Sequence, residues 1–307
     1  MTFKFAAIFS GQGSQHPGMA SGVCSTELGS ELFERANNAL GFDLKQLCLD
    51  GSAEDLKLTA NAQPAIYAVS YALYKLFEAE TGARPSIGAG HSLGEYSALA
   101  AAGVFSFEDG LKAVRRRGEL MQSSVPVGKG AMAAILGADD ADLAGACGDI
   151  SKNKENIVVP ANFNCHGQTV VSGHKPAVEE ILTRFKGKLL EVSAPFHSPL
   201  MAPAAEAMID VLDGIQFNDA AFPIVSNIDN AARVKASDFK DSLIAQITGA
   251  VLWDSGVRRI VETGVDTFVE FGPGKVLTGL MRRIDKNLKS FNFSSVDELK
   301  SILPNFQ

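Results

Sequence analysis

Apolar residues along this chain gather in short runs, and longer stretches that favour helix separate them. One apolar run covers residues 3–9 and another ends at Gly90, each followed by turn-forming residues. Short apolar runs bounded by turns predict buried strands, and this alternation with helices predicts an α/β core with a mainly parallel sheet. We expect helices at residues 28–40, 61–80, 107–122, 200–212, 238–247 and 253–262, one that starts at 93 and one that ends near 284, further strands at 222–227 and 267–271, and a short strand and terminal helix within 285–307.

The pattern changes between residues 128 and 195. The expected order there is β-α-β-β-α-β, which is the ferredoxin-like split motif and can form a self-contained small subdomain. Turn-rich segments border it on both sides. We therefore expect a discontinuous core of residues 1–127 and 196–307, interrupted by a subdomain at 128–195, with a cleft between the two. The elements behind this expectation are strands at 131–136, 157–160, 169–172 and 188–192 and helices at 139–148 and 175–185.

The composition excludes several classes of protein. With 307 residues and 46% hydrophobic content, the chain can bury a full core. No apolar run approaches the roughly 18 residues of a membrane helix, and the apolar N-terminal run is too short for a secretory signal. A net charge of −7 argues against nucleic acid as the main partner. Four cysteines without metal or Cys-x-x-Cys spacing indicate free thiols, so we expect a cytoplasmic protein.

The strongest chemical signal is Gly-His-Ser-Leu-Gly at residues 90–94. Ser92 lies where the strand ending at Gly90 turns into the helix that begins at Leu93. In such an elbow the flanking glycines allow strand and helix to pack closely, and the serine hydroxyl is held out beside the positive end of the helix. A turn that merely joins two elements is the alternative.

A second glycine-rich loop, at residues 11–15, follows the first strand. A dinucleotide site is disfavoured, because His16 occupies the place of the third glycine and no helix follows directly. The loop instead lets backbone N–H groups approach a ligand. We therefore expect the Gln12 and Leu93 N–H groups to form an oxyanion hole. Gly-Pro-Gly-Lys at 272–275 is too short for a phosphate-binding loop and is interpreted as a tight turn.

The chain has five histidines, and His197 is the best placed to act as a base for Ser92. Pro195 and Pro199 restrict the loop that carries it, and the loop follows the predicted small subdomain. His91 is adjacent to the serine, but its side chain should leave the elbow in another direction. A lone loop histidine can equally be structural, so the residues alone leave both interpretations open.

Two predicted helices carry residues that need an explanation. Pro64 is expected in the first turn of the helix at 61–80, where a missing N–H is harmless.

The helix at 107–122 carries three adjacent arginines, at 115, 116 and 117. Neighbouring helix positions differ by roughly 100°, so the three cannot share one face. A solvated basic face suits the first two.

Five motifs occur along the chain in order. They are Gly11–Gln15, Gly90–Ser97, Arg117-Gly118 with Met121-Gln122, Pro195–Ser198 and Gly272–Lys275. Together they resemble the malonyl-CoA:acyl carrier protein transacylases of fatty acid synthesis. The resemblance covers nearly the whole chain and weakens after about residue 284. It implies an α/β-hydrolase-like core with an inserted ferredoxin-like subdomain.

The resemblance also implies catalytic roles. Ser92 is the expected nucleophile and His197 its base. The backbone carbonyl of Gln246, in place of a carboxylate, would steady the imidazole. The N–H groups of Gln12 and Leu93 would bind the oxyanion, in agreement with the expectation from the residues themselves.

Substrate-binding residues follow by the same resemblance. Arg117 would grip the malonyl carboxylate, and an acetyl group would leave its guanidinium unpaired, a penalty of about 2 to 5 kcal/mol. Asn162 and Asn164 are expected to contact the pantetheine arm or the acyl group.

The expected reaction transfers malonyl from malonyl-CoA to Ser92 and then to the phosphopantetheine thiol of acyl carrier protein, with no metal and no bound cofactor. We expect a monomer that binds neither nucleic acid nor membrane. Because carrier proteins of this pathway are acidic, we also expect a basic docking patch. Its candidates are Lys129, Lys175, Arg282, Arg283 and Lys286.

Two other functions stay open at this point. Acyltransferases of polyketide synthases share these motifs, although a chain without carrier or ketosynthase segments favours the discrete enzyme. A serine esterase would use Ser92 and His197, but it would have no need of Arg117 and would be expected to place an acidic partner before the histidine.

Overall fold

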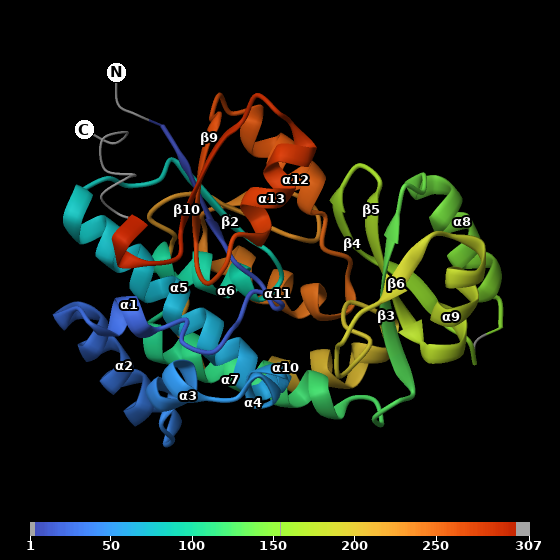
Figure 1. Cartoon of the computed structure of the whole chain (residues 1–307), viewed down its shortest axis with the longest axis horizontal. Helices are drawn as coiled ribbons and strands as arrows, with labels where there is room; N and C mark the ends of the chain where they lie inside the picture. Colours follow the sequence, from blue (N-terminus) through green and yellow to red (C-terminus); the bar gives the residue numbers. More distant parts are fainter. Residues whose placement is uncertain (1–3, 154, 299–307) are drawn as a thin grey trace.

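The computed structural model describes residues 4–153 and 155–298, which form two sheets with helices packed around them (Figure 1). The larger sheet has the order β10-β9-β1-β2-β7-β8. Its first five strands are parallel, and β8 runs antiparallel to β7. The α/β core with a mainly parallel sheet is therefore confirmed. The strands are β1 (Ala6–Phe9), β2 (Ile87–Gly90), β7 (Ile224–Val225), β8 (Ala232–Arg233), β9 (Thr267–Phe271) and β10 (Lys289–Phe293).

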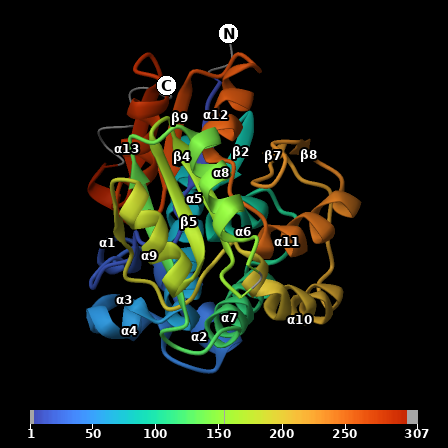
Figure 2. The ribbon, with the colours of Figure 1, turned by 90° about the vertical axis from the view of Figure 1, so that its right-hand side faces the viewer.

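The second sheet has the order β4-β5-β3-β6, with every pair of neighbours antiparallel. Helices α8 and α9 pack on it and close a small hydrophobic core of their own. Figure 2 shows this unit in front of the larger sheet. The predicted ferredoxin-like insert is confirmed, whereas its boundaries at 127/128 and 195/196 stay a prediction. The elements are β3 (Gly130–Leu136), α8 (Asp140–Ile150), β4 (Val158–Cys165), β5 (Gln168–His174), α9 (Lys175–Arg184) and β6 (Gly187–Leu189).

Helices cover both faces of the larger sheet. Alternate residues of a strand point to opposite faces, so Phe5, Ala7 and Phe9 pack in the cluster that contains α5, while Ala6 and Ile8 pack in the cluster that contains α12 and α13. Strands buried on both faces explain the apolar runs of the sequence. The helices are α1 (Ser21–Cys24), α2 (Glu27–Leu40), α3 (Leu44–Asp50), α4 (Ala53–Lys57), α5 (Thr59–Thr81), α6 (Leu93–Ala101), α7 (Phe107–Ser123), α10 (Ala202–Asp213), α11 (Phe239–Thr248), α12 (Trp253–Val261) and α13 (Val276–Ile284), with 3-10 turns at Pro199–Met201 and Ala236–Asp238.

Several predicted bounds were wrong. Strand β4 continues to Cys165 instead of ending at residue 160, because β5 pairs with it along almost its whole length, past two irregularities in register. Strand β7 is only two residues long, and β6 ends at Leu189. The short helices α1, α3 and α4 were not predicted, because they are too brief to show a periodic pattern. The predicted terminal helix falls largely at 299–307, outside the described residues.

Helix α5 begins earlier than predicted, so Pro64 lies beyond its first turn. Proline lacks an N–H, and the carbonyl of Ala60, four residues earlier, therefore loses its helical donor. Arg115 donates from Nη1 to that carbonyl at 2.8 Å. Arg115 is thus half-buried and structural, contrary to the expected solvated face, whereas Arg116 is exposed and pairs with Glu119.

Two backbone hydrogen bonds join the small sheet to the larger unit. Phe163 N donates to the carbonyl of Val251 at 2.9 Å, and Val251 N donates to the carbonyl of Ala161 at 2.8 Å. These bonds connect β4 to the segment before α12. None of the helices in the described part of the chain has the length and apolar character needed to span a bilayer.

Candidate active site

Ser92 lies in a strained turn between β2 and α6. Its φ is 52° and its ψ is −104°, a conformation that costs a non-glycine residue about 1–3 kcal/mol. Both flanking glycines are required by close packing. A Cβ on Gly90 would lie 1.9 Å from the carbonyl carbon of Gly94, and a Cβ on Gly94 would lie 2.1 Å from the carbonyl oxygen of Phe9. The predicted elbow is therefore present, held between β1, β2 and α6.

Asn227, two residues after β7, fixes the backbone of the elbow through two hydrogen bonds. Its Oδ1 accepts from Ser92 N at 2.7 Å, and its Nδ2 donates to the carbonyl of Gly90 at 2.8 Å. Asn227 was not predicted as a site residue, because it contacts the elbow from 135 positions away along the chain. Strand pairing between β2 and β7 brings the two together.

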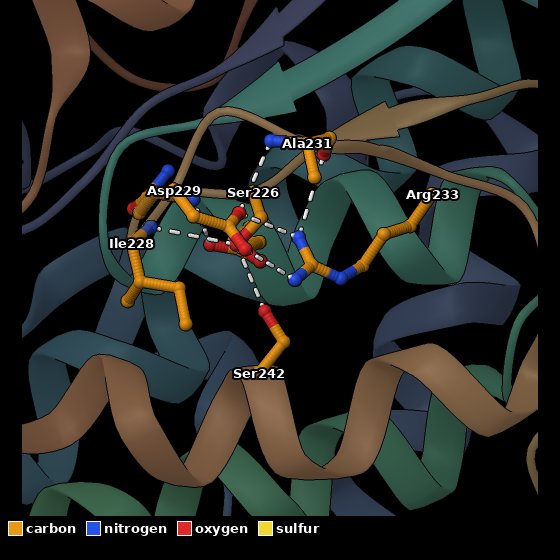
Figure 3. Close-up of polar contacts among 8 residues, drawn as sticks. Ser226, Ile228, Asp229, Ala231, Arg233 and Ser242 are labelled. Atoms are coloured by element: carbon orange, nitrogen blue, oxygen red, sulfur yellow. Dashed lines mark hydrogen bonds and ion pairs between the residues drawn. The ribbon is translucent and has the colours of Figure 1, made fainter.

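The turn that follows Asn227 is braced by polar contacts, as Figure 3 shows. Arg233 donates to both carboxylate oxygens of Asp229, at 2.8 and 2.7 Å, and the hydroxyl of Ser226 lies 2.8 Å from that of Ser242 on α11. A two-pronged arginine–carboxylate pair fixes geometry well. The β7–β8 turn therefore has a fixed position relative to α11.

His197 completes a pair with Ser92. Its Nε2 lies 2.7 Å from the Ser92 hydroxyl oxygen. Its Nδ1 lies 2.9 Å from the carbonyl of Gln246 and 3.1 Å from that of Gly249, at the C-terminal end of α11. Because both partners of Nδ1 only accept hydrogen bonds, Nδ1 carries the proton, and Nε2 is left free to accept one from Ser92. Burial and the nearby Arg117 lower the pKa of His197 to about 3, so the imidazole is neutral at physiological pH.

Arg117, on α7, is only 1% exposed and lies against the nucleophile. Its Nη2 donates to the Ser92 hydroxyl at 3.1 Å and to Gln246 Oε1 at 2.9 Å, while Nη1 donates to Gln63 Oε1 at 2.9 Å. Among the residues that the structure describes, no carboxylate lies within ion-pair distance of this guanidinium, and its Nε has no partner. A buried cation without a counter-ion is unfavourable, so the site is prepared for an anion.

A cavity of about 370 Å³ opens in front of these groups. Its walls come from both units: Ser92, His197 and Arg117 belong to the elbow, a loop and α7 of the larger unit, and Met132 and Val170 belong to the small sheet. The predicted cleft between the two units is therefore present. The cavity is large enough for a small acyl group with part of the arm that carries it.

The two backbone N–H groups expected to bind an oxyanion lie on either side of the elbow. Gly11 packs so closely that a Cβ there would lie 2.5 Å from the carbonyl oxygen of His91, and the next residue, Gln12, lines the same cavity as Ser92. Leu93 is the first residue of α6. Within residues 4–153 and 155–298, neither N–H has an acceptor. Both are thus available to a ligand, and their role stays a prediction.

Asn162 and Asn164 both line the cavity. They lie two positions apart on β4 and therefore share one face of that strand. Asn164 Oδ1 is 2.9 Å from His91 Nε2, whose ring leaves the elbow away from the Ser92–His197 pair. This contact ties the small sheet to the elbow.

The five cations expected to form one docking patch are separated. Lys175 follows β5, and its N–H donates to the carbonyl of Lys129, so these two lie at one end of the strand. Arg283 bonds to Gln168 at the other end, next to the cavity. Arg282 and Lys286, like Arg283, are exposed at or just after the C-terminal end of α13.

Comparison with known proteins adds to this geometry. The family model of the acyl transferase domain matches residues 6–301. The malonyl CoA-acyl carrier protein transacylase of Bacillus subtilis is 42% identical over 97% of this chain and 95% of its own. The crystallised enzyme of that name from Coxiella burnetii superimposes with a TM-score of 0.96 at 36% identity, covering 100% and 98% of the two chains. A malonyl-transacylase solved in complex with a type II PKS acyl-carrier protein superimposes with a TM-score of 0.94 at 39% identity, covering 98% of this chain and 99% of its own.

Proposed function

The chain belongs to the acyl transferase domain family, in its malonyl-CoA:acyl carrier protein transacylase group, and from this premise we propose that it transfers malonyl from coenzyme A to the phosphopantetheine thiol of an acyl carrier protein. One observation carries the choice of acyl group. Within the part of the chain that the structure describes, Arg117 is a buried cation with no carboxylate in ion-pair contact, and its Nη2 lies 3.1 Å from the Ser92 hydroxyl oxygen. A carboxylate that binds it must lie very close to the carbon that Ser92 attacks. Malonyl, whose two carbonyl carbons are separated by one methylene, meets that requirement.

The first half of the proposed reaction acylates Ser92. His197 Nε2 takes the hydroxyl proton as the oxygen attacks the thioester carbon, and the carbonyl oxygen gains negative charge. The N–H groups of Gln12 and Leu93 would stabilise that charge. Collapse of the intermediate breaks the carbon–sulfur bond, and His197 returns the proton to the departing coenzyme A sulfur. A malonyl-serine ester is left.

The second half runs in the opposite sense with a different thiol. The pantetheine thiol of the carrier protein gives its proton to His197 and attacks the ester, and Ser92 recovers a proton as it leaves. The carbonyls of Gln246 and Gly249 stabilise the imidazolium that forms in each half, because they lie at the negative end of α11. Every step is assigned to side chains and backbone groups, so the proposal requires no metal or cofactor.

The carrier protein must approach the open side of the cavity. The exposed cation Arg283 of α13 bonds to Gln168, which lines the cavity, and with its exposed neighbour Arg282 it suits an acidic partner. Lys129 and Lys175, at the other end of β5, are not part of this proposed surface. We also propose a cytoplasmic location, which the four free cysteine thiols support.

Intact-protein mass measurement tests the function directly. After brief exposure to malonyl-CoA, we expect Ser92 to carry one malonyl group, and addition of carrier protein should move that group to the carrier. Release of free malonate without transfer would instead indicate an esterase. Because one solved relative binds a type II PKS carrier, carriers of fatty acid and polyketide pathways should be compared. A Ser92→Ala variant is the control.

A further inference from the structure

Glu95 is a buried carboxyl group that the proposed reaction does not use. It lies on α6, three residues after the nucleophile, and is only 2% exposed. Its Oε2 accepts hydrogen bonds from Gln246 Nε2 at 2.8 Å and from Asn227 N at 3.1 Å. Burying a carboxyl group is costly, so its position directly behind the active site needs an explanation.

The side chain of Gln246 connects Glu95 to Arg117. Its amide nitrogen donates to Glu95 and, at 3.0 Å, to the carbonyl of Ser92, while its amide oxygen accepts from Arg117 Nη2 at 2.9 Å. An amide that directs its nitrogen to one side must direct its oxygen to the other. The carboxylate therefore holds the amide in the orientation that Arg117 requires.

We propose that Glu95 is a positioning residue for malonyl recognition: through the amide of Gln246, it holds the Arg117 guanidinium against Ser92. The inference rests on the proposed function. Without an acceptor at residue 95, the Gln246 amide nitrogen keeps only the Ser92 carbonyl at 3.0 Å and Asn227 Oδ1 at 3.4 Å, and the amide is held less firmly against turning its N–H groups toward Arg117. Two donors would then face each other, and Nη2 would lose its fixed position beside the hydroxyl.

The charged groups around Glu95 are consistent with this role. Arg117 from α7 and Arg233 from β8 both favour its ionised form, and Tyr96 lies next to it on α6. Arg233 is already paired with Asp229. Burial nevertheless raises the pKa of Glu95 to about 7. Ionised or protonated, the group keeps an acceptor oxygen for Gln246, so hydrogen bonding rather than charge carries the proposed effect.

Two substitutions separate the acceptor from the charge. Glu95→Gln keeps an acceptor oxygen and removes the ionisable group; Glu95→Leu removes both. Initial rates of Ser92 acylation are measured with malonyl-CoA and acetyl-CoA. We expect Glu95→Leu to lower kcat/KM for malonyl by roughly 10- to 100-fold, the range for an unmade buried hydrogen bond, and to change that for acetyl by less than about 3-fold. Glu95→Gln should recover most of the malonyl rate.

The matched control is Glu270, a second buried glutamate, which accepts from the first N–H groups of α13. Glu270→Gln should leave the malonyl-to-acetyl ratio unchanged, and thermal unfolding of each variant reports on folding. If Glu95→Leu lowered kcat/KM equally for malonyl-CoA and acetyl-CoA, the inference would be overturned. It would also be overturned if a folded Glu95→Gln variant lost as much malonyl activity as Glu95→Leu. Absence of malonyl loading in the unmodified protein would instead refute the proposed function.

Discussion

Replacement of Arg117 by alanine is the most direct test of acyl selectivity. The guanidinium is 1% exposed, and its hydrogen-bond partners are the neutral groups of Gln63, Gln246 and Ser92. A malonyl carboxylate would therefore be its first counter-ion. Loss of one partner of such a buried pair costs about 2 to 5 kcal/mol, which corresponds to a roughly 30- to 5,000-fold fall in kcat/KM for malonyl loading.

Acetyl loading should respond differently, because a methyl group gains nothing from a buried cation. We expect Arg117→Ala to leave acetyl loading within about 10-fold of the unmodified protein, since the Ser92–His197 pair stays in place. Quenched reactions followed by intact-protein mass spectrometry give both rates on one enzyme preparation. Equal losses for the two acyl groups would refute the assigned role of Arg117, because a purely structural arginine would affect every substrate alike.

Two further predictions concern stability. The folded-state pKa of His197, about 3, lies below its ordinary value of 6.5, so the unfolded chain binds the proton more readily. The contribution of neutral His197 to the free energy of unfolding is fully present above about pH 6.5 and declines toward pH 3 by at most about 1.4 kcal/mol per pH unit. Urea unfolding at several pH values should therefore show a shallower decline of this free energy in His197→Gln. An unchanged slope would contradict the prediction. Gly94→Ala would place a carbon 2.1 Å from the Phe9 carbonyl oxygen and should lower the free energy of unfolding by about 2 kcal/mol or more. Gly145→Ala on α8, where a Cβ meets nothing within 4 Å, is the control, and equal melting temperatures for the two variants would be inconsistent with the close packing.

Local signals in the sequence were sufficient to predict the elbow and the order of the main strands and helices. The elbow depends on a strand, a turn and a helix that are contiguous in the chain. The βαββαβ insert was predictable for the same reason, because each of its elements has its own apolar pattern. Short elements such as α3 and β8 were not, since so few residues carry no periodicity.

The side-chain contacts behind the active site could not be predicted, although the resemblance implied the role of the Gln246 backbone carbonyl. Asn227 contacts the elbow across 135 positions and Gln246 across 154, and only the packing of β7 and α11 brings them there. Glu95 was visible as a residue of the elbow motif, but its two hydrogen-bond partners come from those same distant elements. The hydrogen bond from Arg115 to the Ala60 carbonyl, which lacks a helical donor because of Pro64, could not be predicted either, because it joins two separate helices.

The backbone hydrogen bonds between β4 and Val251 determine where the two units that line the cavity are hardest to separate. Along that seam, N–H and C=O groups link the two units directly, so separation there would leave two N–H and two C=O groups without partners. Lys57 and Glu191, which line the cavity, instead link the two units through exposed side chains that water can solvate once they part. The two units are therefore joined more rigidly along the β4 seam than at the Lys57–Glu191 pair.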